Sequence, residues 1–145
     1  MEKEIYTIGT STRSLKDFIK ILLSHGINVA VDVRRFPFSK RFPHFCKDTL
    51  ALALKENGVA YFYLGNELGG LRKSGYERYT NSKEFREGIE RLESIASTSK
   101  VTFFCCERLF FRCHRRFIAK ILEKKGWKVY HIVDLNVIYR EREED

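Results

Sequence analysis

The chain has 145 residues, of which 43% are hydrophobic and 14% aromatic, so it holds enough apolar side chains for a sizeable core and is not a disordered chain. Its 27 Lys and Arg exceed its 19 Asp and Glu and give a net charge of +8. This excess favours an anionic partner, either a small molecule or a nucleic acid. No apolar run approaches the roughly 18 residues that suggest a transmembrane helix, so no membrane partner is expected.

The four cysteines and the N-terminus bear on the compartment. The cysteines lie at positions 46, 105, 106 and 113 of a chain with ample core. This predicts reduced thiols in a cytoplasmic protein rather than a disulfide framework. The first four residues carry acids and lead straight into a strand-like run, unlike a secretion signal. The absence of Gln, together with one Met and abundant Lys and Glu, hints at a thermophilic source.

Five short apolar runs alternate with amphipathic segments along the chain. Ser14 precedes the first helical pattern, with Asp17 in capping-box position, and Ser82 precedes a later one. Because strands separated by helices need crossover connections, the pattern predicts an α/β fold: a single three-layer domain over residues 1–145, with a mainly parallel five-stranded sheet flanked by helices. The acidic tail 141–145 is expected to fray. The predicted strands are 5–8, 29–33, 59–63, 101–105 and 127–133, and two further helices are predicted from 48 or 49 to 57 and from about 113 to 125.

Ligands of such sheets bind beyond the carboxyl ends of the strands, which makes the segments after the strands the candidate site. Polar, basic and thiol side chains gather in these segments. We expect seven of these side chains, which follow four different strands, to converge on one cleft: Ser11, Asp32, Arg34, Glu67, Glu107, His114 and Arg115.

The segment after the fourth strand is the richest in chemistry. His114 and Arg115 fall at the start of a helix, where the helix dipole disfavours cations. An anion bound there through backbone N–H groups and arginine forks would explain this arrangement. The alternative is an internal ion pair in which Glu107 or Glu67 neutralises the cluster. Cys105, close to this basic helix start, is either a thiolate nucleophile or a buried core thiol.

Two other features each have two interpretations. Asp32 ends the second strand and fits either a general base or a partner for an arginine of its own loop. The loop from Arg34 to Phe45 interleaves four basic residues with four Phe. It fits either a surface that stacks bases and holds phosphates or a loop that packs onto the domain.

Several of these patterns occur in order over nearly the whole chain. They are Tyr6-Thr7-Ile8-Gly9-Thr10-Ser11, Asp32-Val33-Arg34 with Pro37 and Ser39, Pro43-His44-Phe45, Glu67-Leu68-Gly69-Gly70, Cys105-Cys106-Glu107 and Cys113-His114-Arg115. Together they resemble the family known as domain of unknown function 488, whose motif after the fourth strand looks like Cys-x-Glu followed by Cys-His-Arg. The family often has His where this chain has Thr10. The resemblance implies no reaction.

The function expected from the sequence is that of an enzyme, a hydrolase or transferase, acting on an anionic, phosphate-bearing substrate such as a nucleotide or a nucleic-acid component. One alternative is a non-catalytic nucleic-acid-binding module that uses loop 34–45. Another is a metal or redox site on Cys105, Cys113 and His114, although their spacing lacks the paired thiols of structural zinc sites. No metal ligand is assigned and no cofactor is identified. The residues expected to be catalytic are Cys105, Glu107, His114 and Asp32, and those expected to bind substrate are Ser11, Arg34, Glu67, Gly69, Gly70 and Arg115.

Overall fold

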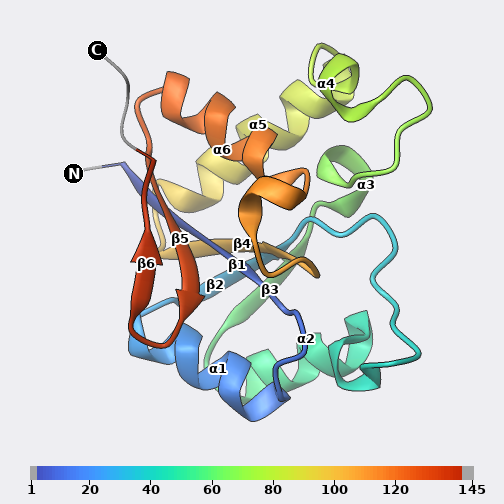
Figure 1. The fold of residues 1–145 in the computed structure, drawn as a ribbon. Helices are drawn as coiled ribbons and strands as arrows, with labels where there is room; N and C mark the ends of the chain where they lie inside the picture. Colours follow the sequence, from blue (N-terminus) through green and yellow to red (C-terminus); the bar gives the residue numbers. More distant parts are fainter. Residues whose placement is uncertain (1–2, 142–145) are drawn as a thin grey trace.

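The computed structural model describes residues 3–141 and shows one mixed sheet with helices on both faces (Figure 1). The strand order is β3-β2-β4-β1-β5-β6, in which the first five strands are parallel and β6 is antiparallel to β5. The predicted α/β class is confirmed, with one strand more than expected. The expected fraying of the tail concerns residues that lie almost entirely outside the described ones. The strands are β1 (Glu4–Gly9), β2 (Val29–Asp32), β3 (Ala60–Tyr63), β4 (Val101–Cys105), β5 (Lys128–Asp134) and β6 (Val137–Tyr139).

The additional strand β6 forms a hairpin with β5. Only two residues separate the two strands, and so short a connection permits antiparallel pairing alone. Ile132 pairs with Ile138, and His131 pairs with Tyr139. The run Val137–Tyr139 has only three residues and is exposed on both sides, so its sequence lacks the buried pattern of the other strands.

The helices lie on the two faces of the sheet according to the direction in which the chain crosses it. From β1 through β2 to β3 the chain moves one way and packs α1 and α2 on one face; it then returns to β4 and β5 and packs α5 and α6 on the other (Figure 1). This is the result of right-handed crossovers in both directions. The helices are α1 (Leu15–Ser24), α2 (Lys47–Glu56), α3 (Gly65–Leu68), α4 (Tyr76–Tyr79), α5 (Lys83–Ala96) and α6 (Arg115–Lys124), with 3-10 turns η1 (Pro43–Phe45) and η2 (Phe110–Arg112).

Strand β4 lies at the point where the sheet reverses its order. Its neighbours β1 and β2 send their connections to the α1–α2 face, whereas β4 sends its own to the α6 face. Loops that diverge to opposite faces leave a crevice between them at the carboxyl edge, which is where ligands of open α/β sheets bind. The fold therefore places the loop after β4 in the middle of the candidate site.

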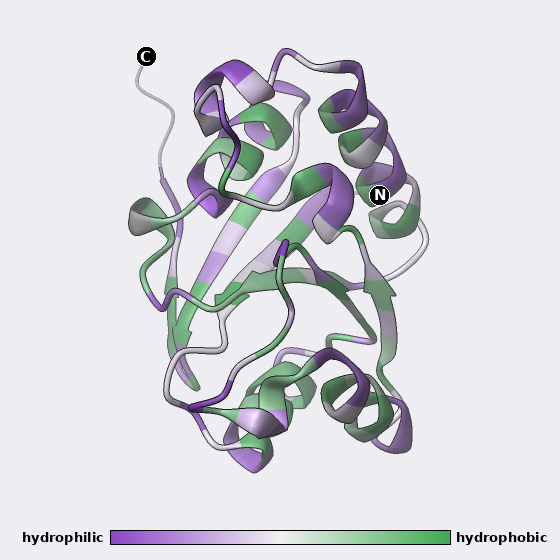
Figure 2. Cartoon of the chain, turned by 90° about the vertical axis from the view of Figure 1, so that its right-hand side faces the viewer, coloured by the Kyte–Doolittle hydropathy of each residue, from purple (hydrophilic) through white to green (hydrophobic). Residues whose placement is uncertain are grey.

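Alternating side chains of the strands supply the two halves of the core. Val31 and Phe103 pack toward α5 and α6, whereas Ala30 and Phe104 pack toward α1 and α2. Apolar colour accordingly runs along the strands and along the helix surfaces that face them (Figure 2). Phe18 of α1 contacts Phe104 edge to face, with ring centroids 5.7 Å apart.

Serine N-caps define the starts of α1 and α5. The Ser14 hydroxyl oxygen accepts a hydrogen bond from the Asp17 N–H at 3.1 Å, and Ser82 accepts one from Phe85 at 3.1 Å. The last helix begins at Arg115, two residues later than predicted, and the short helices α3 and α4 occupy a stretch that the sequence presented as a loop. Among the helices of residues 3–141, none is long and apolar enough to cross a membrane.

Candidate active site around Cys113

A cavity of about 610 Å3 opens at the carboxyl edge of the sheet, where the loops after β1, β2, β3 and β4 meet. Gly9 permits the loops after β1 and β4 to touch, because a Cβ at residue 9 would lie 1.9 Å from the Glu107 carbonyl oxygen. Backbone bonds fix this contact: Thr10 donates to the Cys105 carbonyl at 2.8 Å and Ser11 to that of Cys106 at 2.9 Å. The central position of the cavity thus follows from backbone geometry.

Six of the ten site residues expected from the sequence line this cavity. They are Ser11, Arg34, Gly70, Cys105, Glu107 and His114. The other four, Asp32, Glu67, Gly69 and Arg115, are not among its lining residues in the described part of the chain. All ten lie at the carboxyl ends of strands or in the connections that follow, up to the first residue of α6, but only six of them line the cavity.

Arg115 lies beneath the cavity wall and is fully buried. Its Nε donates to Cys105 Sγ at 3.1 Å and to Cys113 Sγ at 3.4 Å, and its Nη1 donates to Thr7 Oγ1 at 3.1 Å. Its Nη2 donates to the carbonyl oxygens of Glu107 and Arg108. Because every nitrogen of the guanidinium is engaged in this way, the expectation that Arg115 binds substrate directly is corrected: it organises the loop after β4.

The sulfur of Cys113 lies beside the Arg115 guanidinium. Cys113 Sγ accepts from the Arg115 backbone N–H at 3.3 Å and lies 3.0 Å from Cys105 Sγ. The hydrogen bond from the Cys105 thiol, followed by the Arg115 charge, lowers the pKa of Cys113 to about 6. The sequence alternative in which Glu107 or Glu67 neutralises this cluster is wrong, because neither carboxylate forms an ion pair with Arg115 among residues 3–141. A buried guanidinium without a counter-charge would cost several kcal/mol, so the thiolate and the cation stabilise one another.

The pKa of the Cys105 thiol is shifted in the opposite direction to that of Cys113. Its side chain is 1% exposed, and burial raises the pKa of its thiol well above the ordinary value. A protonated, buried thiol is a poor nucleophile. Burial therefore argues against Cys105 as the attacking thiol, whereas Cys113, whose pKa is lowered, lines the cavity.

His114 lines the cavity as a neutral imidazole. Its Nε2 lies 2.8 Å from the Val33 carbonyl oxygen, which only accepts, so Nε2 carries the proton and Nδ1 is unprotonated. Burial, with the Arg115 charge as a further cause, lowers the pKa of His114 to about 4. A Cβ at Gly70 would approach Nδ1 to 3.3 Å. The glycine thus leaves this basic nitrogen uncovered.

A second buried charge cluster lies on the other face of the sheet. Asp32 is fully buried, and its carboxylate accepts from Arg34 Nε at 2.9 Å and Nη2 at 2.8 Å. The Tyr61 hydroxyl donates to the same carboxylate at 2.6 Å, and Arg34 Nη1 donates to the Phe45 carbonyl at 2.6 Å. Of the two sequence interpretations of Asp32, the paired one holds. The expectation of a general base is corrected because Arg34 and Tyr61 occupy both carboxylate oxygens.

Glu67 and Gly69 are also placed differently from expectation. The short helix α3 turns Glu67 toward α5, where its Cβ lies 2.7 Å from the place of a Cβ on Gly88. Gly69 packs against Arg35, because a Cβ at residue 69 would lie 2.5 Å from the Arg35 Cβ. Both residues support the loop after β3, and neither forms the cleft wall.

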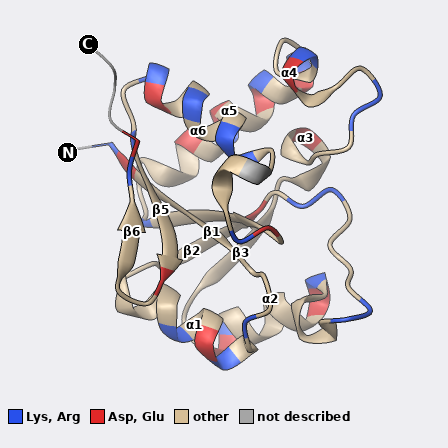
Figure 3. Cartoon of the chain, in the orientation of Figure 1, with Lys and Arg blue, Asp and Glu red and all other residues tan. Residues whose placement is uncertain are grey.

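Several residues that were not among the ten expected site residues complete the cavity wall. Two of them are cationic, and Figure 3 shows how Lys and Arg follow the loop after β2. Phe36 and Phe38 line the cavity and are exposed, whereas Phe45, which also borders it, is 1% exposed and belongs to the core. The Phe45 end of loop 34–45 therefore packs onto the domain, whereas Phe36 and Phe38 remain exposed. The lining residues outside the ten include Arg35, Phe36, Phe38, Leu71, Arg108 and Cys113.

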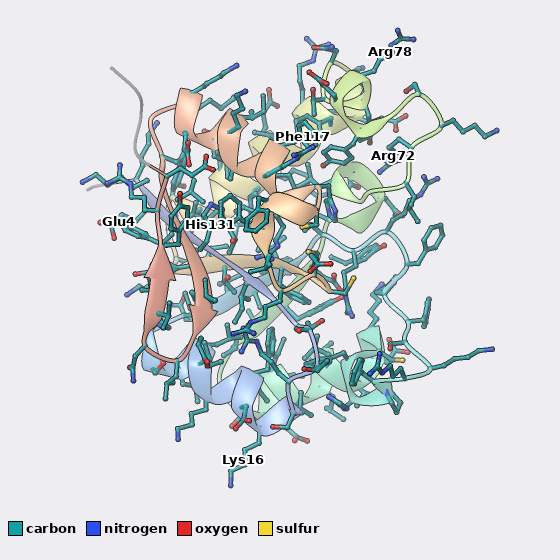
Figure 4. The ribbon with its side chains drawn as sticks, viewed as in Figure 1. Glu4, Lys16, Arg72, Arg78, Phe117 and His131 are labelled. Atoms are coloured by element: carbon teal, nitrogen blue, oxygen red, sulfur yellow. The ribbon has the colours of Figure 1, made fainter. Side chains whose placement is uncertain are left out.

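A hydrogen-bond relay extends from Arg115 away from the cavity. Thr7 Oγ1 accepts from Arg115 Nη1 and forms a hydrogen bond with His131 Nδ1, 2.7 Å away. His131 lies on the α6 side of the sheet (Figure 4). Its ring stacks on that of Phe110, with ring centroids 3.6 Å apart. Burial lowers the pKa of His131 to about 3, so the ring is neutral beside the guanidinium.

The metal site considered from the sequence finds no support in this geometry. Among residues 3–141, no group of three or more His, Cys, Asp or Glu side chains is arranged to hold a metal ion. The Nε2 of His114 is committed to Val33, as described above. The dithiol part of that alternative does have a structural basis, since the Cys105 and Cys113 sulfurs are in contact.

Comparison with known proteins places the chain in a family. The family described as Domain of unknown function DUF488 matches residues 14–122, which include the loops after β2, β3 and β4 and most of α6. No curated protein matches the chain. No solved structure matches it either. Since the match covers most of the sequence, the chain belongs to the DUF488 family.

Proposed function

We propose that the chain is an enzyme that uses the Cys113 thiolate to transfer a group from an anionic substrate, either to water or to a second acceptor. The observation that carries the proposal is the contact of Cys113 Sγ with the buried Arg115 and the Cys105 thiol, in the wall of a cavity large enough for a nucleotide-sized molecule. A thiolate that is charged at neutral pH and lies at a cleft is the usual form of a catalytic cysteine.

The reaction needs two steps. Cys113 Sγ forms a bond to an electrophilic carbon or phosphorus of the substrate, and the leaving group departs with the electron pair of the broken bond and takes a proton from solvent. Water or another acceptor then attacks the same atom, its proton passes to His114 Nδ1, and the Cys113 thiolate leaves. The pKa of about 4 makes His114 a base in this scheme, not an acid. Arg115 stabilises the thiolate before the first step and after the second.

The cavity wall favours a substrate with an anionic group and a flat apolar part. Arg35 and Arg108 line the cavity without a carboxylate partner among the described ion pairs, whereas the charge of Arg34 is balanced by Asp32. Phe36 and Phe38 supply aromatic surface beside these cations. A phosphate-bearing nucleotide or nucleic-acid component has both features. A cytoplasmic location, which keeps thiols reduced, is part of this proposal.

One observation favours a second candidate, a nucleic-acid-binding module without chemistry. Phe36 is 62% and Phe38 is 74% exposed, which suits base stacking along an extended strand. The two candidates differ in their need for the thiolate. A module would bind oligonucleotides with a steep salt dependence and would tolerate Cys113→Ser, whereas the enzyme would lose turnover.

Charged and neutral alkylating reagents test the anionic, thiolate-bearing site. In a Cys46→Ser/Cys106→Ser background, we expect iodoacetate and iodoacetamide to modify Cys113 at pH 7, with inorganic phosphate and AMP slowing both. Arg35→Gln and Arg108→Gln should slow iodoacetate several-fold and leave iodoacetamide unchanged. Arg41→Gln is the matched control, because Arg41 belongs to the same loop and stacks on Phe42 without lining the cavity. An unreactive Cys113, or modification that neither anion slows, would refute the proposal.

A further inference from the structure

The sulfur atoms of Cys105 and Cys113 lie closer together than a site with a single nucleophilic thiol requires. Cys105 and Cys113 are both free thiols, with their Sγ atoms 3.0 Å apart. A disulfide bond is about 2.05 Å long, so closing it requires the sulfurs to move together by about 1 Å. Cys105 is the last residue of β4, and Cys113 lies between η2 and α6. The fold thus brings the two thiols together from separate segments of the chain.

The pair is also asymmetric in the way that thiol–disulfide exchange requires. Cys113 lines the cavity, where a disulfide can reach it, whereas Cys105 is buried directly behind it. The first thiol to react must be charged and accessible, and the second needs access only to the first. Exposure and charge thus assign Cys113 as the attacking thiol and Cys105 as the resolving thiol.

Arg115 supplies the electrostatics of the second step. Its Nε donates to both sulfurs, at 3.1 Å and 3.4 Å. While Cys113 is charged, it balances the guanidinium and Cys105 keeps its proton. Once Cys113 is bound to another sulfur, the guanidinium loses its counter-charge, and the same cation then favours the thiolate of Cys105. The buried cation therefore moves the negative charge from the first thiol to the second.

We propose that Cys105 and Cys113 carry out thiol–disulfide exchange with a small acidic disulfide bound in the cavity. Cys113 Sγ attacks one sulfur of the disulfide RSSR and forms a mixed disulfide with it, and the first RS⁻ departs. Cys105 gives its proton to that thiolate, attacks Cys113 Sγ and releases the second RS⁻. The balance is one thiol, one thiolate and RSSR giving the Cys105–Cys113 disulfide, RSH and RS⁻, so two electrons pass to the substrate. An external dithiol then returns the pair to its reduced form.

The acidic character of the substrate follows from the wall around the pair. Arg35 and Arg108 line the same cavity, and the one acidic side chain among its lining residues is Glu107. This inference rests on the proposed function, because both need the Cys113 thiolate. It differs in requiring Cys105 as a reactant.

Oxidised glutathione is the acidic probe and cystamine the cationic one. The protein is Cys46→Ser/Cys106→Ser, in which Cys105 and Cys113 are the remaining cysteines, at pH 7 under nitrogen. We expect oxidised glutathione to convert it to a Cys105–Cys113 disulfide, seen by mass spectrometry as a loss of two hydrogens and a cross-linked peptide. Adding Cys105→Ser should instead trap glutathione on Cys113, and cystamine should react several-fold more slowly than oxidised glutathione.

Each other result overturns the inference. Glutathione that remains on Cys113 while Cys105 is present would show that Cys105 does not resolve the mixed disulfide. Equal rates for the two probes would refute the acidic substrate class. If iodoacetamide modifies Cys113 but neither disulfide does, exchange is refuted while the proposed function stands; if neither class of reagent modifies Cys113, both fall. Formation of the Cys105–Cys113 disulfide is measured in the protein that keeps both thiols. The test therefore remains decisive even if the Cys105→Ser variant folds poorly.

Discussion

Replacing Cys105 by Ala removes the thiol proton that Cys113 accepts, and it leaves Arg115 in place. The first cause of the low Cys113 pKa is this hydrogen bond, across the 3.0 Å between the two sulfurs. A hydrogen bond to a charged group is worth about 1.5–3 kcal/mol. Since one pKa unit corresponds to about 1.36 kcal/mol, the pKa of Cys113 should rise by about 1–2 units from its value of about 6. Cys105→Ser keeps a hydroxyl donor at the same place and is the matched control.

The rate of alkylation should change in opposite directions at low and high pH. A rise of about 1.5 units lowers the thiolate fraction at pH 6 from about one half to about 3%, but it raises the intrinsic nucleophilicity about fivefold, because a more basic thiolate attacks faster. The net expectation for Cys105→Ala is a rate about threefold lower at pH 6 and about fivefold higher above pH 9.

Iodoacetamide kinetics from pH 5 to 10, followed by mass spectrometry of the Cys113 peptide in a Cys46→Ser/Cys106→Ser background, measures both limbs. The crossing of the two rate profiles distinguishes electrostatics from damage to the fold, which would change the rate in one direction throughout. Superimposable profiles for Cys105→Ala and Cys105→Ser would refute the reasoning, because they would show that the thiol proton does not stabilise the thiolate.

Three further expectations concern other residues at the carboxyl edge of the sheet. Asp32→Asn leaves the Arg34 charge buried without a partner and should lower the free energy of unfolding in urea by about 3–5 kcal/mol; a loss below about 1 kcal/mol would contradict the pairing. Because the folded-state pKa of His114, about 4, lies below its ordinary value of 6.5, the unfolded chain binds the proton first, so stability is complete above pH 6.5 and is lost as the pH falls toward 4. The slope should approach about 1.4 kcal/mol per pH unit for this residue, with a contribution of the same sign from His131, and His114→Gln should flatten it in urea titrations. Phe38→Ala should leave the melting temperature unchanged because the ring is 74% exposed, yet weaken AMP binding by about fivefold or more in calorimetry; unchanged affinity would exclude Phe38 from the site.

The fold was largely predictable because its signals are local. Ser14 and Ser82 cap the helices that the spacing of the following apolar residues predicted. The buried strands β2 and β4 appear in the sequence as short runs rich in apolar residues. The strand β6 was missed because Val137–Tyr139 is short and exposed, and it forms only through its turn to β5. The helices α3 and α4 have four residues each, too few for a helical period to show in the sequence.

The sequence predicted the edge of the sheet at which the cavity lies, but not which of the two thiols has the lowered pKa. The rule that ligands bind at the carboxyl edge selected the loops that line the cavity of about 610 Å3. Which thiol carries the charge depends on burial and on the direction of the Arg115 fork, and neither is a property of local sequence. The signal that could have identified Cys113 was its position directly before His114 and Arg115. Glu67 was misplaced for a related reason, since the turn of α3 decides which way its side chain points.

The most direct measurement of the central claim is an NMR titration of protein labelled with 13Cβ-cysteine. The account predicts that the Cys113 resonance titrates with a midpoint near its pKa of about 6, while the Cys105 resonance remains that of a protonated thiol through neutral pH. A Cys113 midpoint near the ordinary thiol value of about 8.5, or a Cys105 resonance that titrates first, would contradict it.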